Sequence, residues 1–463
     1  MFAGCGAEAS PTPVPFRVVT PIDVDPREGG TELRVAIEQV GQADPIAEHS
    51  FPVDTSVLSV GPVPYGTGYS FRVDVLAGEF VYAKGRSLPF DILSDAPLAE
   101  RPDVFLGRVG VFERPTEDPP PDDRVVGGVA DASGALLATA SGRLYRYRIH
   151  DPAPERDGEP SLGVVRQVSI RAGATWAPMG PGRLLAVGGS SAGAILVDST
   201  GLTIAELRTG ELENHRVGAA VVSLLGGTSA LLLGGAPGSA TPASGAVTRI
   251  DVQEGETGEI TLVTTRLDPL PAPVRDASAT SVPVRDEGPC PCERVVVTGG
   301  VTASSRGLLV DPDGVDATVT ADLGVSLRDS SLVPIDTGLV LVVGGRGTDD
   351  VPAADLILLS VRPGALVPIV PRPDPLSAAR ALPGSARFGD GLALIVGGIG
   401  ADGAPLSSAE IYEFRPDLLP GDVAWTQSLA MPEASPFVLP MMDRSVLATG
   451  TSGAYVYVPP RGR

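Results

Sequence analysis

Apolar and polar residues alternate along the first hundred residues of the chain. The alternation is clear at residues 16–19, 33–37 and 69–75, and glycines and prolines separate these stretches. A period of two places successive side chains on opposite faces of an extended chain, so each stretch predicts a half-buried strand. Residues 16–98 therefore predict about six or seven strands that form an antiparallel β-sandwich.

Beyond residue 100, an apolar strand that ends in two glycines recurs five times. The glycine pairs are Gly188-Gly189, Gly234-Gly235, Gly299-Gly300, Gly344-Gly345 and Gly397-Gly398. Degenerate copies at residues 136–140 and 446–450 flank them, as expected of terminal repeats. An arginine opens a strand of small residues before every copy except the last, at Arg124, Arg171, Arg216, Arg275, Arg328 and Arg380. The mean spacing of these arginines is about 51 residues, and a third strand follows each glycine pair.

These units resemble kelch repeats. The resemblance rests on the paired glycines, on third strands that end at Asp198, Asp251 or Asp311, and on Tyr412 and Trp425 in one unit. It covers residues 103–459 and implies a β-propeller with four strands in each blade. Most units lack the tryptophan of the family, so we expect aliphatic side chains to pack the blades.

The number of units predicts seven blades. The last unit ends near Val458 without a fourth strand, whereas residues 104–112 form a strand that has no blade of its own. We expect this strand to complete the last blade, because closure from both ends of the chain removes exposed sheet edges. A six-bladed ring would require the unit at Arg124 to lie outside it.

An all-β fold with three parts follows. Residues 1–15 are a flexible start, residues 16–98 a β-sandwich, and residues 99–463 a seven-bladed kelch-like propeller closed by residues 104–112. In its number of strands the sandwich resembles immunoglobulin-like and fibronectin type III modules, although it has no Cys-Trp-Cys signature. The resemblance implies a linker or spacer.

Composition narrows the classes of partner. The 463 residues include 56 acidic and 35 basic residues, for a net charge of −21, and Lys84 is the single lysine. Nucleic-acid binding requires clustered cations, which the sequence lacks, so we expect no nucleic-acid partner. No apolar run reaches the roughly 18 residues of a membrane-spanning helix.

The cysteines suggest an exported protein. Residues 2–5 (Phe-Ala-Gly-Cys) resemble the lipobox of bacterial lipoproteins, which implies lipidation of Cys5 as the one attachment to a membrane, at the outer membrane or the cell surface. Residues 6–15 are rich in proline and small residues, as suits a tether. The alternative is an accidental cysteine in a disordered start. Cys290 and Cys292 could form a small disulfide in an oxidising compartment, or remain two thiols.

No catalytic constellation is evident in the sequence. Kelch-type propellers include copper radical oxidases, whose site needs histidines and a cysteine-linked tyrosine. The three histidines of this chain, His49, His150 and His215, show no metal-ligand spacing. We therefore expect no metal and no cofactor.

The recurring arginines are the best candidate binding residues. In kelch propellers the first strand of each blade is innermost, and in some eukaryotic adaptors arginines at this point of the repeat bind acidic peptides. The resemblance thus implies that Arg171, Arg216, Arg275, Arg328 and Arg380 gather at one mouth of the channel, as donors to carboxylate, phosphate or sulfate groups. The alternative is pairing with neighbouring carboxylates, such as Asp276 and Asp329.

We therefore expect a monomeric, non-catalytic surface lipoprotein that binds an unidentified protein or glycan. An enzyme acting on carbohydrate, of the lyase or epimerase type, is the alternative. Clustered Arg, Tyr, Glu or His side chains in an open pocket at one channel mouth would distinguish it.

Overall fold

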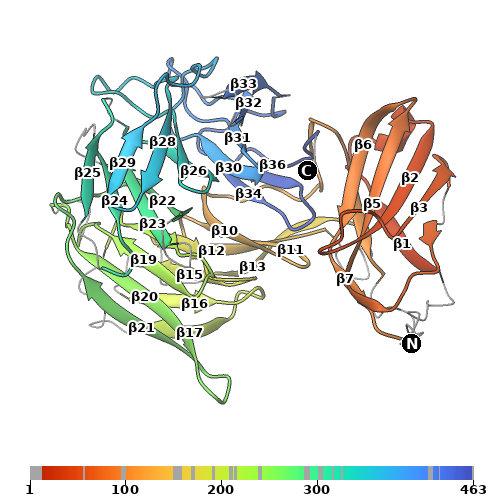
Figure 1. Cartoon of the computed structure of the whole chain (residues 1–463), viewed down its shortest axis with the longest axis horizontal. Helices are drawn as coiled ribbons and strands as arrows, with labels where there is room; N and C mark the ends of the chain where they lie inside the picture. The colour runs from red at the N-terminus through yellow and green to blue at the C-terminus, as the bar shows by residue number, and fades with distance from the viewer. Residues whose placement is uncertain are drawn as a thin grey trace, which may run out of the picture.

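A computed structural model describes the chain at residues 13–55, 58–94, 98, 101–149, 159–167, 173–189, 193–207, 212, 216–237, 242–285, 292–300, 306–314, 318–324, 327–415, 421–426 and 428–460. A smaller N-terminal domain lies beside a larger ring of blades (Figure 1). Helix is nearly absent from the described part, where a short 3-10 turn, η1 (Pro26–Gly29), is assigned. No helix of the described residues is long and apolar enough to cross a membrane.

The ring consists of seven antiparallel sheets of four strands, which confirms the predicted seven-bladed β-propeller. The innermost strands β10, β14, β18, β22, β26, β30 and β34 contact one another in this order, and β34 contacts β10. From the centre outward, the first two blades contain β10 (Val125–Asp131), β11 (Gly134–Thr139), β12 (Arg143–Arg148) and β13 (Ser161–Gln167), then β14 (Thr175–Pro178), β15 (Leu184–Val187), β16 (Ala194–Val197) and β17 (Thr203–Leu207). The third, fourth and fifth blades contain β18 (Ala220–Ser223), β19 (Ser229–Leu233), β20 (Val247–Glu254) and β21 (Ile260–Leu267); β22 (Ala277–Val284), β23 (Cys292–Gly299), β24 (Arg306–Val310) and β25 (Val319–Asp322); and β26 (Ser331–Asp336), β27 (Leu339–Val343), β28 (Leu356–Arg362) and β29 (Ala365–Pro368). The sixth and seventh blades contain β30 (Gly384–Gly389), β31 (Leu392–Val396), β32 (Ala409–Glu413) and β33 (Asp422–Trp425), then β34 (Phe437–Pro440), β35 (Val446–Thr449), β36 (Ala454–Tyr457) and β9 (Phe112–Glu113).

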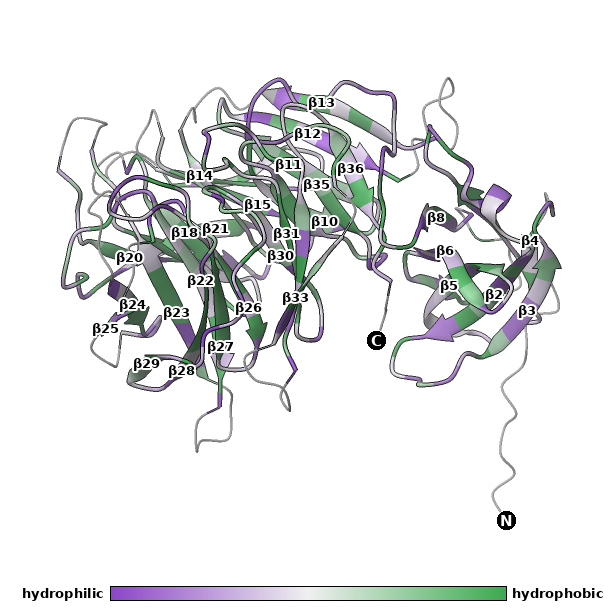
Figure 2. Cartoon of the chain, turned by 90° about the horizontal axis from the view of Figure 1, so that it is seen from above, coloured by the Kyte–Doolittle hydropathy of each residue, from purple (hydrophilic) through white to green (hydrophobic). Residues whose placement is uncertain are grey.

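Aliphatic side chains pack the blades against one another. The second strands β15, β19 and β35 are buried at every position, and their apolar runs extend through the middle of the blades (Figure 2). A strand buried on both faces needs apolar residues without alternation. Valine, leucine, isoleucine and alanine therefore fill the space between blades, where the low aromatic content leaves few rings.

The glycine pairs lie where the second strand leaves its blade beside the next one. Gly234 has φ of 66°, and a Cβ there would lie 2.2 Å from the carbonyl oxygen of Val274 in the following blade. The Gly234 and Gly235 amides also donate to the carbonyls of Ala246 and Val274. Only glycine allows this left-handed backbone with so close an approach, so the repeated pair has a structural role.

The last blade is closed by a shorter strand than predicted. β9 pairs antiparallel with β36, and Phe112 lies opposite Tyr457. Most of the predicted closing strand, residues 104–112, instead belongs to β8 (Asp103–Arg108) of the N-terminal sheet. Val104 and Leu106 on one face of β8 pack into the N-terminal core, while Phe105 on the other contacts propeller residues. An apolar run buried on both faces fits either domain, which explains the difference.

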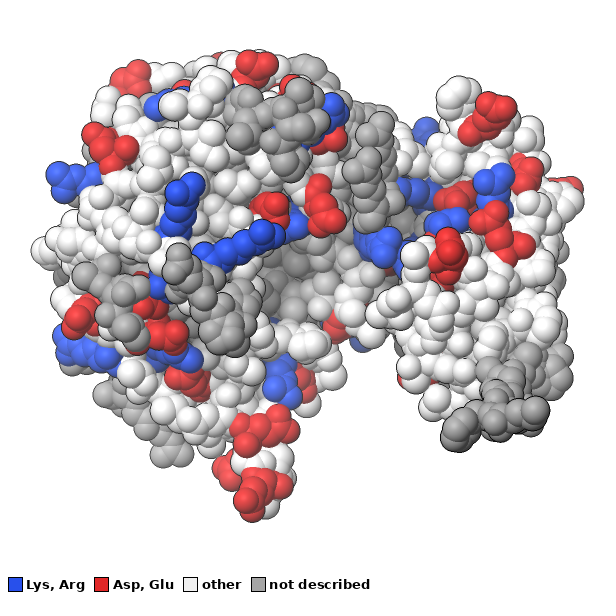
Figure 3. Space-filling view, viewed as in Figure 1, with Lys and Arg blue, Asp and Glu red and all other residues white. Residues whose placement is uncertain are grey.

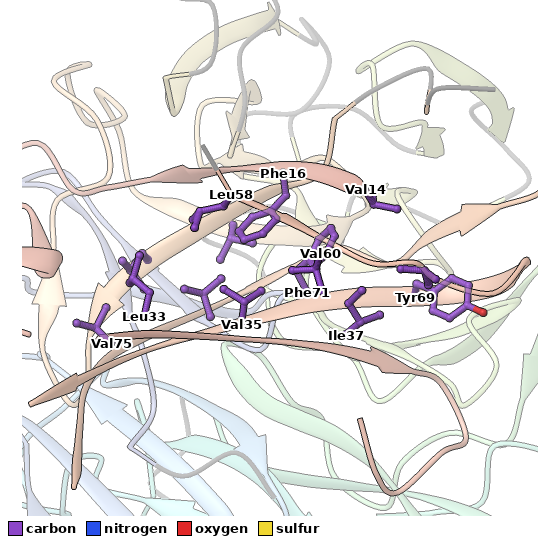
Figure 4. Packing of buried hydrophobic residues seen from close by; sticks show 14 of the residues in the cluster. Val14, Phe16, Leu33, Val35, Ile37, Leu58, Val60, Tyr69, Phe71 and Val75 are labelled. Carbon is purple, nitrogen blue, oxygen red and sulfur yellow. The ribbon is translucent and has the colours of Figure 1, made fainter. Parts of the chain in front are cut away.

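The N-terminal domain is one curled sheet. Its strands are β1 (Val14–Val19), β2 (Glu32–Gln39), β3 (Ala47–Pro52), β4 (Leu58–Val60), β5 (Gly66–Ala77), β6 (Phe80–Ser87), β7 (Phe90–Ile92) and β8. Their order is β3-β2-β5-β6-β8-β1-β4, and β7 pairs with β5. The sheet is nearly closed, like a barrel, and two separate sheets as in the predicted sandwich are not clearly present. Side chains of β1 and β4 lie over those of β2 and β5, with Phe16 stacked on Phe71 at 4.4 Å between ring centroids (Figure 4).

Candidate functional site

A cleft of about 1420 Å³ lies between the N-terminal domain and the propeller. Strands β2, β5 and β6 of the N-terminal domain line one wall. The other wall contains the β30–β31 and β34–β35 turns, the end of β32 and the segment after β36. Basic and acidic side chains alternate on the part of the N-terminal domain that faces the propeller (Figure 3). The described lining includes five basic and six acidic residues, so the N-terminal domain and the propeller both contribute charged side chains to this cleft.

Ion pairs hold most of the N-terminal wall. Arg72 on β5 bonds to Glu38 at 2.6 Å and to Asp74 at 3.1 Å, and Arg86 on β6 also bonds to Glu38. Burial raises the pKa of Asp74, although the nearby cations oppose this shift. Pairing in the sheet places Arg72 opposite Arg86 and Asp74 opposite Lys84. The alternation of the strands thus directs these side chains to one face.

Lys84 differs from the other cations of this wall. It is half-buried, and its side chain makes no hydrogen bond or ion pair with another described residue. Burial lowers the pKa of its ammonium group; Asp74 opposes the shift, whereas the positive charges of Arg444 and Arg72 add to it. Lys84 therefore carries a charge that the described neighbours compensate only in part.

Arg444 faces the cleft from the β34–β35 turn of the propeller. Its φ of 68° lies in the left-handed region. The β14–β15 turn of the second blade and the β34–β35 turn are closed by the same backbone hydrogen bond. The Met179 amide donates to the Arg183 carbonyl in the first, and the Met441 amide donates to the Ser445 carbonyl in the second. In this alignment Gly182, with φ of 66°, stands where Arg444 stands. An arginine thus occupies a glycine position, and its exposed side chain bonds to no other described residue.

We expect Arg444→Gly to stabilise the protein by about 1 kcal/mol, because glycine adopts this backbone conformation without the steric cost that a Cβ adds. Chemical denaturation would measure the change in unfolding free energy. Arg362→Gly is the matched control: Arg362 is exposed at the end of β28 with an ordinary φ, and the change should destabilise by roughly 0.5–1 kcal/mol. Equal effects of the two changes would contradict the assignment of strain to Arg444.

The acidic groups of the propeller wall are mostly engaged. Asp443 is buried and accepts hydrogen bonds from the Ser445 amide and hydroxyl at 3.0 and 2.6 Å, and burial raises its pKa. Glu413 on β32 bonds to Arg415 at 2.7 Å. Asp390 in the β30–β31 turn bonds to Arg387 at 3.2 Å. Asp443, Glu413 and Asp390 are therefore hydrogen-bonded or ion-paired, whereas the Arg444 side chain bonds to no other described residue.

Two of the predicted channel-mouth arginines are built into the blades. Arg380 is fully buried, and its guanidinium bonds to Glu410 at 2.5 Å and to the Gly397 and Ser408 carbonyls. Arg216 is 6% exposed and donates to the Ala246 carbonyl and the Thr248 hydroxyl. In both blades the arginine at the start of the first strand joins the third strand to it.

The others lie nearer the surface. Arg275 is close to Asp276, at 3.4 Å, and Arg328 pairs with Asp350. Arg171 lies outside the described residues. The structure thus places the four described arginines in intramolecular contacts, and a ligand for Arg275 or Arg328 stays a prediction. Cys5 and Cys290 also lie outside the described part, so lipidation and the disulfide stay predictions; Cys292 opens β23 opposite Val284.

Sequence comparisons assign no family, because no family model and no curated protein matches the chain. Among solved structures, the chain is similar to a fungal alcohol oxidase of the AA5 family in complex with copper. The TM-score is 0.53 at 16% identity, over 76% of this chain and 77% of the other. A second match is a RAG complex bound to one melted and one unmelted RSS, with a TM-score of 0.44 and 12% identity over 61% of this chain and 93% of the other. The likeness to the oxidase is one of fold.

The residues that the structure describes do not form a copper centre of that kind. Among the residues that the structure describes, no three His, Cys, Asp or Glu side chains come together as a metal site. His49 lies on β3 of the N-terminal domain, and His150 and His215 lie outside the described part.

Proposed function

We propose that the protein is a non-catalytic binding protein that holds a protein or glycan ligand in the cleft between its two bodies. The observation that supports this most is the convergence of eleven charged side chains from both bodies on one recess of about 1420 Å³. Pockets for small ligands measure roughly 300–1,000 Å³. The cleft therefore suits a segment of a larger polar ligand.

The remaining parts of the chain fit this role. In this proposal the propeller is of the kelch type, and the N-terminal domain is an immunoglobulin-like or fibronectin-like module that supplies the second wall of the cleft. A lipid at Cys5 anchors the monomer at the outer membrane or cell surface. Palmitate labelling of the wild type that is lost in Cys5→Ala would support the lipid anchor. A wild-type precursor that stays unlabelled would contradict it.

An unbiased array of glycans and peptides, probed with the full chain, tests the binding role. We expect a hit whose binding is lost when Lys84→Met and Arg444→Gly are combined, because both residues face the cleft. Arg362→Ala is the control for an arginine outside it. If binding survives the cleft changes but is lost when Arg275→Ala and Arg328→Ala are combined, the binding site would be assigned to the channel mouth instead of the cleft. Chemical conversion of a bound glycan would favour the enzyme alternative.

A further inference from the structure

We propose that Lys84 and Arg444 form a subsite for a single anionic group, a carboxylate or sulfate, of an acidic oligosaccharide bound in the cleft. This inference rests on the proposed function and names the ligand chemistry of the same site. The two residues come from opposite walls, so an anion between them would contact both bodies.

The other cations of the cleft already have partners. Arg72 and Arg86 share Glu38, and Arg415 is paired with Glu413. Lys84 and Arg444 have no such partner among the described residues. Lys84, Arg86 and Arg444 line the same cleft, and in keeping with this placement the positive charge of Arg444 lowers the pKa values of Lys84 and Arg86. An anion would relieve this repulsion and accept hydrogen bonds from both groups.

The backbone of Arg444 adds a second observation. Its left-handed conformation costs stability, and the equivalent turn of the second blade avoids this cost with Gly182. No hydrogen bond or ion pair of the Arg444 side chain with another described residue offsets the cost. A bound anion would supply the missing contact.

The acidic residues of the cleft indicate a ligand with few charges. Glu38, Asp74, Asp336, Asp390, Glu413 and Asp443 also line it, and these carboxylates would repel a dense polyanion. Paired carboxylates and guanidiniums do, however, offer acceptors and donors to hydroxyl groups. A chain rich in hydroxyls with widely spaced anions, such as an acidic oligosaccharide, fits this lining better than an acidic peptide does.

The single lysine makes the subsite directly measurable. The rate of Lys84 acylation would be measured by mass spectrometry after proteolysis. The measurement would be repeated in the presence of four candidate ligands: oligogalacturonate, sulfated chondroitin oligomers, a neutral galactan oligomer and poly-glutamate. We expect at least one acidic saccharide to slow acylation about tenfold when saturating, and its Kd to rise about tenfold in Lys84→Met and in Arg444→Gly. Arg362→Ala should bind as the wild type does. Because Arg444→Gly should be at least as stable as the wild type, its loss of binding would not reflect unfolding.

Other outcomes would overturn the subsite. Equal protection by the neutral oligomer, stronger protection by poly-glutamate, or no protection by either acidic saccharide would each reject it, as would unchanged affinity in Arg444→Gly. A neutral array ligand that is lost with the combined cleft changes would reject the subsite and leave the proposed binding role standing. Absence of any array ligand would count against that role itself.

Discussion

Arg380→Ala should destabilise the protein by about 3–5 kcal/mol, because it leaves a buried carboxylate without its cation. Arg380 and Glu410 are both fully buried and lie 2.5 Å apart. After the change, Glu410 keeps the Ser377 amide at 2.9 Å, and the Gly397 and Ser408 carbonyls each lose a charged donor. Chemical denaturation would measure the loss.

Arg328→Ala is the matched control for Arg380→Ala. Arg328 opens the preceding blade at the corresponding point of the repeat, but its side chain is 34% exposed and Asp350 is 67% exposed. Such a surface pair contributes about 0–1 kcal/mol. Similar small losses in both variants would show that the Arg380 guanidinium is dispensable to the stability of the blade.

Phe112→Ala should destabilise the protein by about 3–5 kcal/mol, the range for truncation of a buried phenylalanine. Phe112 is 7% exposed and packs against Tyr457 with 4.9 Å between ring centroids. It also forms half of β9, the two-residue strand that completes the last blade. The change therefore weakens the join between the start and the end of the ring.

The same measurement on Phe80→Ala provides the control, since Phe80 is 80% exposed at the start of β6 and should change the unfolding free energy by less than about 0.5 kcal/mol. Limited proteolysis should also cut β36 faster in Phe112→Ala than in the wild type. An intact β36 together with an unchanged unfolding free energy would mean that β9 does not hold the ring closed.

The propeller could be predicted from the sequence because its signal repeats. Five glycine pairs, which recur about every 50 residues on average, each mark the same backbone requirement, seen at Gly234 beside Val274. Val104, Phe105 and Leu106 could not be assigned in this way: a strand buried on both faces has no alternation to show which body it joins. Its place in the N-terminal sheet depends on pairing with β6 and β1, which are tertiary contacts.

The candidate site was largely hidden from the sequence for a related reason. Glu38 and Lys84 belong to one sheet of the N-terminal domain, and Arg444 joins them in the cleft only because the propeller packs beside that domain. Two signals were present nonetheless: Lys84 is the only lysine, and Arg444 stands where an aligned repeat has Gly182. The arginines Arg216 and Arg380 looked like a binding ring because their buried partners, Thr248 and Glu410, lie about 30 residues later in the chain.

The join between β9 and β36 also sets an order on biogenesis. The Phe112 and Tyr457 strands pair across nearly the whole propeller, and Thr426 bonds back to the Gly110 carbonyl over 316 residues. During synthesis, the seventh blade cannot be completed until β36 has emerged from the ribosome. Contacts of such sequence separation form slowly. A nascent chain would thus carry six complete blades and an open sheet edge, which chaperones would need to protect until β36 is made.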